Sequence, residues 1–121
     1  MILADTTVWI DHLRADNRAL RIELNLLNIA MHPFVVAELT LGSLHSREKT
    51  LLALEMLPSV KVARLNEVRQ MIEAHSLYSR GIGLTDAHLI ASTLITPSTQ
   101  LWTLDKRLQG VAEALGVAWQ P

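Results

Sequence analysis

Four acidic residues lie within or directly beside apolar segments of this 121-residue sequence: Asp5, Glu38, Asp86 and Asp105. Carboxylates that converge repel one another, so a cluster of them is costly unless cations neutralise it or some acids stay protonated. Ligation by oxygen alone, in a chain without cysteine, suits hard ions such as Mg²⁺ or Mn²⁺. Such an ion can polarise a phosphate and lower the pKa of an attacking water. The chemistry that these residues predict is therefore phosphodiester hydrolysis.

Each of these acids also has an ordinary structural explanation when it is taken alone. Asp5 and Asp105 could cap the helices expected to follow them. Asp86 could be a favourable negative charge in the first turn of a helix. Capping cannot explain Glu38, because it interrupts a hydrophobic helical stretch. The other eight acids are expected on solvated helix faces or near helix starts.

Composition favours one globular domain, residues 1–121, because half of the residues are hydrophobic and the length suffices for a real core. The absence of cysteine excludes disulfides, thiolate zinc sites and cysteine nucleophiles. The N-terminus does not read as a signal peptide and no apolar run is long enough to cross a bilayer, so no membrane association and a cytoplasmic location are expected. The net charge of −1 lacks the positive excess of most nucleic-acid binders. Bound cations would supply positive charge where a phosphate must lie.

Short apolar strands are expected to alternate with amphipathic helices along the whole chain. The expected strands are 1–4, 29–31, 60–63, 101–104 and 117–119, and the expected helices are 6–13, 17–27, 33–41, 46–57, 66 to about 81, 85–95 and 106–115. This alternation predicts an α/β fold around a mainly parallel sheet of about five short strands. Ligands of such sheets bind beyond the carboxyl ends of the strands. Asp5 and Asp105 should therefore share that edge if their strands are neighbours, and the N-terminal turns of the helices carrying Glu38 and Asp86 can face it.

Four segments, in this order, resemble a PIN domain: Leu3–Trp9 (LADTTVW), Val36–Leu39 (VAEL) followed by Gly42, Asp86–Ala91 (DAHLIA) and Leu101–Asp105 (LWTLD). More narrowly, the chain resembles the VapC toxins of bacterial and archaeal toxin–antitoxin pairs. The resemblance covers essentially the whole chain. It implies a single PIN-like domain with three α/β/α layers and a Mg²⁺- or Mn²⁺-dependent endoribonuclease activity. It also implies a homodimer silenced by a cognate VapB-type antitoxin within a larger complex.

The resemblance also assigns roles by position. The four acids listed above match the family's metal pocket. Thr6 matches the small hydroxyl residue after the first acid, and Thr103 matches the hydroxyl residue two positions before the last one. Thr103 is expected to orient a carboxylate by a hydrogen bond. The mechanism implied is in-line attack by activated water on RNA, leaving a 5′-phosphate and a 3′-hydroxyl.

Other residues carry weaker expectations. Lys106 and Arg107 adjoin Asp105 and could contact RNA phosphates, although solvated helix residues are the ordinary alternative. His88 is expected to pack or to lie at the surface, and surface positions are expected for the remaining histidines: His12, His32, His45 and His75. The leucine-rich helical segments 20–27 and 51–57 supply apolar surface for a dimer or for an antitoxin helix, and an antitoxin Arg or Lys could reach the acids.

Two other functions compete with ribonuclease activity. The first is a catalytically silent RNA- or protein-binding module on the PIN fold, whose sequence signature would be loss of the acids, and all four are present. The second is an aspartyl-phosphate phosphotransferase or phosphatase with Asp5 as nucleophile. It is disfavoured because Thr7 stands where such phosphatases carry a second Asp.

Overall fold

A computed structural model describes residues 1–121 and contains three short strands and seven helices. In chain order these are β1 (Ile2–Ala4), α1 (Thr6–Ala15), α2 (Arg18–Asn25), β2 (Ile29–Ala30), α3 (Pro33–Thr40), α4 (Arg47–Glu55), α5 (Leu65–Ala74), α6 (Leu84–Ile95), β3 (Gln100–Trp102) and α7 (Lys106–Ala114). None of the helices is both long enough and apolar enough to cross a membrane.

The strands form one parallel sheet in the order β2-β1-β3, so the first strand is central. Leu3 pairs with Ala30 on one side and with Leu101 on the other. Two isolated parallel bridges, Met31 with Ser59 and Leu101 with Ala118, extend the sheet at its two edges. The α/β class and the parallel sheet predicted from the sequence are thus confirmed.

The expected strands 60–63 and 117–119 are reduced to these bridges. The Val60 N–H still donates to the Met31 carbonyl at 3.0 Å, but the next N–H groups turn to side chains of α6 and its C-cap residue Thr96 instead of a neighbouring strand. The Lys61 N–H donates to the Thr96 hydroxyl (3.0 Å) and the Ala63 N–H donates to the Ser92 hydroxyl (3.1 Å). A backbone N–H that is already paired cannot extend a ladder, so the strand stops after one bridge.

Side-chain caps explain where several helices begin. Asp5, Asn17 and Asp105 each accept a hydrogen bond from a backbone N–H in the first turn of the helix that follows. Helix α5 starts before the expected cap Asn66, because the Glu67 carboxylate accepts the Arg64 N–H at 2.9 Å and fixes the first turn there.

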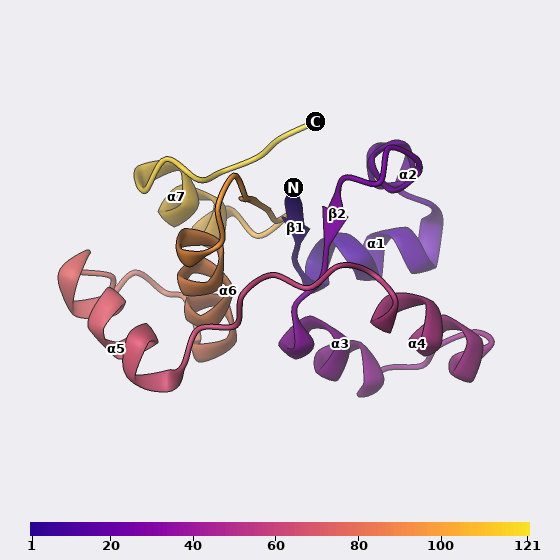
Figure 1. The fold of residues 1–121 in the computed structure, drawn as a ribbon, viewed down its shortest axis with the longest axis horizontal. Helices are drawn as coiled ribbons and strands as arrows, with labels where there is room; N and C mark the ends of the chain where they lie inside the picture. Colours follow the sequence, from indigo (N-terminus) through magenta and orange to yellow (C-terminus); the bar gives the residue numbers. More distant parts are fainter.

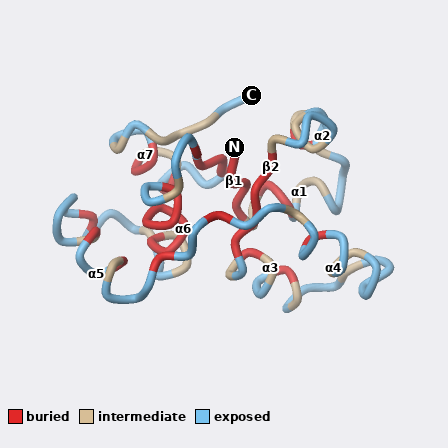
Figure 2. Tube along the Cα trace, viewed as in Figure 1, coloured by how far each residue is buried: buried red, intermediate tan, exposed pale blue.

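Helices cover the strands from two sides (Figure 1): α5, α6 and α7 gather on one side, and α1, α2 and α4 on the other. The buried stretches run along the strands, through α6 and into the inner face of the other helices (Figure 2). All residues of β1 are buried, and α6 is buried continuously from Ala87 to Thr93. The core therefore fixes two elements of the site: β1, which directly precedes Asp5, and α6, which carries Asp86.

Candidate active site

The carboxyl ends of β1 and β3 lie next to each other and place Asp5 beside the loop that carries Asp105. The two strands are parallel neighbours, and the Asp5 N–H donates to the Trp102 carbonyl at 2.9 Å. The loop after β3 therefore starts level with Asp5. Both acids lie at the sheet edge where ligands bind in folds of this kind.

Asp5 is buried and held by hydroxyl groups on both of its oxygens. Its Oδ1 accepts hydrogen bonds from the Thr7 hydroxyl (2.5 Å) and the Val8 N–H (3.2 Å). Its Oδ2 accepts one from the Thr103 hydroxyl. Burial raises the pKa of Asp5 above its ordinary value, although the hydrogen bonds from Thr103, Thr7 and Val8 act in the opposite direction.

Asp105 is exposed and caps α7. Its Oδ1 accepts the backbone N–H groups of Arg107 (2.9 Å) and Leu108 (3.1 Å). The capping explanation from the sequence is thus correct in structural terms, as it is for Asp5. It does not exclude a functional role, because the cap occupies only one of the two carboxylate oxygens.

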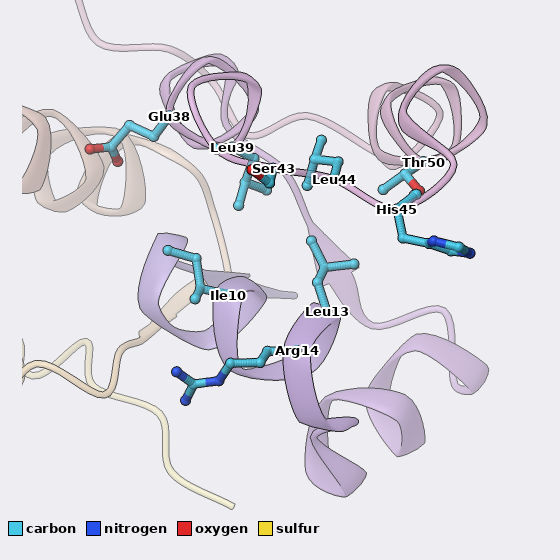
Figure 3. Close-up of a pocket in the computed structure, with 10 residues that line it drawn as sticks. Ile10, Leu13, Arg14, Glu38, Leu39, Ser43, Leu44, His45 and Thr50 are labelled. Carbon is cyan, nitrogen blue, oxygen red and sulfur yellow. The ribbon is translucent and has the colours of Figure 1, made fainter.

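Glu38 lies on the last turn of α3. Its side chain is directed toward the strand-end acids, since its Oε1 accepts a hydrogen bond from the Thr6 hydroxyl, next to Asp5, at 2.6 Å. In Figure 3 its carboxylate turns toward α6, the helix that carries Asp86.

Asp86 is the carboxylate whose pKa is affected by the charges of the other three acids. It lies in the first turn of α6, where burial raises its pKa and a hydrogen bond from the Gly83 backbone lowers it. The negative charges of Asp5, Asp105 and Glu38 each raise the pKa of Asp86 further. Asp86 is therefore near enough to the other three carboxylates for their charges to affect its pKa, so the four sequence candidates lie in the same region of the molecule.

The donor set of this site fits a hard divalent cation. As the side chains stand, no group of three or more His, Asp or Glu residues is close enough to hold an ion, so the carboxylates must turn inward to share one. A cation between them would offset both the burial of Asp5 and the repulsion felt by Asp86. Carboxylate oxygens are the ligands that Mg²⁺ and Mn²⁺ prefer.

The two basic candidates begin α7, and both are exposed. Neither Lys106 nor Arg107 forms a salt bridge within the chain. The side chain of Arg107 lies against Gly81, where a Cβ atom would come within 3.0 Å of the arginine Cδ. Gly81 also has a φ of +78°, which glycine tolerates and other residues rarely adopt. The loop before α6 thus lies against the Arg107 side chain.

Sequence reasoning missed two residues near the site. Thr7 entered the sequence analysis only as part of a motif and as an argument against a phosphatase. Its hydroxyl also accepts the Leu104 N–H at 2.9 Å and so joins the loops after β1 and β3. His32 was expected at the surface and is fully buried. Its Nδ1 accepts the Phe34 N–H and its Nε2 lies 3.0 Å from the Ser92 hydroxyl, so it joins α3 to α6. A histidine directly before a proline at a helix start was the available signal for this cap.

An apolar groove of about 420 Å³ opens beside the acids, between α1, the end of α3 and the loop leading into α4. Figure 3 shows Ile10 and Leu13 of α1 facing Leu39 and Leu44 across it, with Glu38 at one end. Ile10 and Leu13 are 49% and 42% exposed, so the groove offers apolar surface that the chain itself does not cover.

Comparison with known proteins identifies the family. A model of the PIN domain matches residues 2–114, and the chain belongs to the PIN domain family. Two proteins of Mycobacterium tuberculosis, from strains CDC 1551 and H37Rv and each named Ribonuclease VapC32, are 40% identical to it over 118 residues. The matched region covers 98% of this chain and 95% of each relative, so the likeness to VapC-type PIN proteins extends over the whole chain.

Proposed function

We propose that this chain is a metal-dependent endoribonuclease of the VapC type, the toxin of a toxin–antitoxin pair, formed by residues 1–121 as one PIN domain and acting in the cytoplasm. The observation that carries the proposal is the placement of Asp5 and Asp105 after neighbouring parallel strands, with Glu38 bonded to Thr6 beside Asp5. Asp86, in the first turn of α6, is near enough for the charges of these three acids to raise its pKa. The name of the Mycobacterium tuberculosis relatives supports ribonuclease as the activity.

In this proposal the four carboxylates hold Mg²⁺ or Mn²⁺. The bound ion would polarise the scissile phosphate and lower the pKa of the attacking water. The chain's own residues arrange the rest. Thr7 and Thr103 fix the orientation of Asp5, Thr6 fixes one oxygen of Glu38, and the α7 backbone fixes one oxygen of Asp105. Attack by water in line with the leaving oxygen gives a 5′-phosphate and a 3′-hydroxyl.

The substrate is proposed to lie across the start of α7. Arg107, seated on Gly81 and free of salt bridges, is available to contact an RNA phosphate next to Asp105, with Lys106 as a second cation. These contacts would offset the negative potential of the acids and position the phosphate for attack.

The apolar groove is proposed to take a helix of a VapB-type antitoxin. Its apolar walls, Ile10 and Leu13 on one side and Leu39 and Leu44 on the other, suit an amphipathic helix laid into a groove. Glu38 at the end of the groove offers a carboxylate to a basic antitoxin residue, which would compete with the metal. We also propose that the toxin is a homodimer within a larger complex, which light scattering of the purified complex would test.

Cleavage of total cellular RNA by purified, antitoxin-free protein tests the activity. Cuts at discrete sites are expected with Mg²⁺ or Mn²⁺, and they should disappear in EDTA and in Asp5→Asn. The matched control is Asp16→Asn, which removes an exposed acid at the opposite end of α1 from Asp5. New ends should be ligatable 5′-phosphates, so 2′,3′-cyclic phosphates would contradict the mechanism. Folded protein that cuts no RNA with either metal would favour a binding module.

A further inference from the structure

We infer that Tyr78, in the segment that joins α5 to α6 (Figure 1), stacks on an unpaired RNA base close to the bond that is cut. The inference rests on the proposed function and deepens it, because it names the form of RNA that the site takes. That form is a single strand, held through a base by the Tyr78 ring and through its phosphates by Arg80 and Arg107.

Tyr78 is the aromatic residue that the fold leaves uncovered, since it is 61% exposed. Trp9 and Trp102 are buried, and Phe34 and Trp119 are partly covered. Each of these four rings packs against another ring of the chain. The Tyr78 ring packs against none of them, so it offers an apolar, planar surface to a ligand.

The turn before Tyr78 fixes the position of the ring. Helix α5 ends in a Schellman motif, with Ser76 at a φ of +53°. The Ser76 N–H donates to the Glu73 carbonyl at 3.2 Å, and the next N–H, of Leu77, donates to the Ile72 carbonyl at 2.9 Å. The Leu77 side chain is buried in the core and anchors the turn. Tyr78 directly follows this anchor, so stacking would require little further ordering of the backbone.

The same segment reaches the acids a few residues later. Gly81 lies against the side chain of Arg107, where a Cβ atom would come within 3.0 Å of the arginine Cδ. The Gly83 backbone forms a hydrogen bond with Asp86. Three residues of extended chain span at most about 11 Å, so the Tyr78 backbone lies within that distance of Gly81. Tyr78 is therefore close to the start of α7, where the RNA phosphates are proposed to lie.

Positive charge accompanies the ring. The segment 75–83 contains no acidic residue, and its Arg80 is exposed and forms no salt bridge. Arg107 is also free of salt bridges, so two cations flank the path of a strand past Tyr78. Proteins that bind single strands combine cations along the backbone with aromatic rings that stack on bases. A paired base stays within its helix, so an aromatic ring of this kind favours unpaired RNA.

Fluorescence anisotropy of a short, labelled single-stranded RNA of random sequence tests this inference. The protein is Asp5→Asn with Mg²⁺, a background that should bind without cutting. Adding Tyr78→Ala should weaken binding by about fivefold or more, the loss expected for one stacked base. Tyr78→Phe keeps the aromatic ring and should bind as the background does. Tyr78→Leu is apolar without an aromatic face, and it should bind as weakly as Tyr78→Ala.

Three controls separate stacking from charge and from folding. Leu65→Ala removes a side chain of similar exposure, 56%, at the opposite end of α5, and it should leave binding unchanged. Arg80→Gln should reduce the salt dependence of binding, whereas Tyr78→Ala should not, because it removes no charge. The same RNA annealed to its complement should bind Tyr78→Ala and the background about equally.

Steady-state cleavage by the otherwise wild-type chain gives a second measurement that needs no silenced background. Tyr78→Ala should raise the KM for single-stranded RNA and leave kcat nearly unchanged. A Tyr78→Ala protein that binds the single strand as tightly as the background, or that loses affinity for single strand and duplex in equal proportion, overturns the inference. A folded wild-type chain that cuts no RNA with either metal overturns the proposed function itself.

Discussion

Acidification is expected to destabilise this protein through His32. The imidazole Nδ1 accepts the Phe34 N–H at 3.0 Å, so the neutral ring carries its proton on Nε2, which lies 3.0 Å from the Ser92 hydroxyl. A second proton on Nδ1 would break the cap of α3 and place a positive charge at a fully buried position. It would therefore loosen the contact between α3 and α6.

The size of the effect follows from the pKa of His32. Burial lowers that pKa from 6.5 to about 4, with a smaller contribution from the positive charge of His88. Between these two values the unfolded chain binds a proton that the folded chain excludes, so stability is full above pH 6.5 and is lost as the pH falls toward 4. The loss amounts to about 3 kcal/mol, a large part of the about 5–15 kcal/mol of a typical domain. Asp5 and Asp86, whose pKa values are raised, offset part of it in the same range.

Urea unfolding of the metal-free protein at a series of pH values from about 7.5 to about 4 measures this loss. His32→Asn keeps a helix-capping oxygen but cannot titrate. It should be less stable than the wild type near neutral pH, and the difference should shrink steadily as the pH falls. His75→Asn, at an exposed position, should follow the wild type. Wild-type and His32→Asn curves that stay parallel over the whole range would refute the reasoning.

Three further outcomes are expected. Ile90→Ala, at a fully buried position, should cost about 2–5 kcal/mol in urea unfolding, while Ile95→Ala, 38% exposed, should cost far less. Gly81→Ala should raise the KM for RNA, by less than Arg107→Ala does, because its Cβ would lie 3.0 Å from the Arg107 Cδ and displace that side chain. A normal KM would show that the contact between Gly81 and Arg107 does not affect RNA binding. Asp86→Asn should abolish cleavage yet raise the unfolding free energy of the metal-free protein by about 1 kcal/mol, since it removes a partly buried charge repelled by three others; a loss of stability would contradict this.

The sequence predicted the strand ends of the site well because an apolar run followed by an acid is a local signal. Asp5 and Asp105 follow buried strands, and the helices after them begin where their carboxylates cap. The expected strand at 60–63 failed because Lys61 and Ala63 donate to side chains of α6 and its C-cap residue, which lie about 30 residues further along the chain. No local pattern contains that information.

The residues that hold the site together were harder to predict, because their hydrogen-bond partners are also distant in the sequence. The Thr7 hydroxyl accepts a hydrogen bond from the Leu104 N–H, 97 residues away in sequence. No residue near Thr7 in the sequence distinguishes it from a solvated helix residue. Histidine is a polar residue, so the sequence favours a surface position for His32. Its burial depends on the hydrogen-bond partner Ser92, which lies 60 residues further along the chain. The four acids were singled out because they lie within or beside apolar segments, and the ordered resemblance to a family then assigned them to one metal pocket.

The pairing of β1 with β3 has a consequence for the synthesis of the chain. One neighbour of the first strand, β3, begins only at Gln100. The Thr103 hydroxyl that donates to Asp5 lies 98 residues after Asp5 in the sequence. Chains emerge from the ribosome N-terminus first, and contacts between distant segments form late. A nascent chain that has reached only helix α6 carries three of the acids but neither the strand nor the hydroxyl that orders Asp5. The four carboxylates can therefore come together only after the last segments of the chain have been translated.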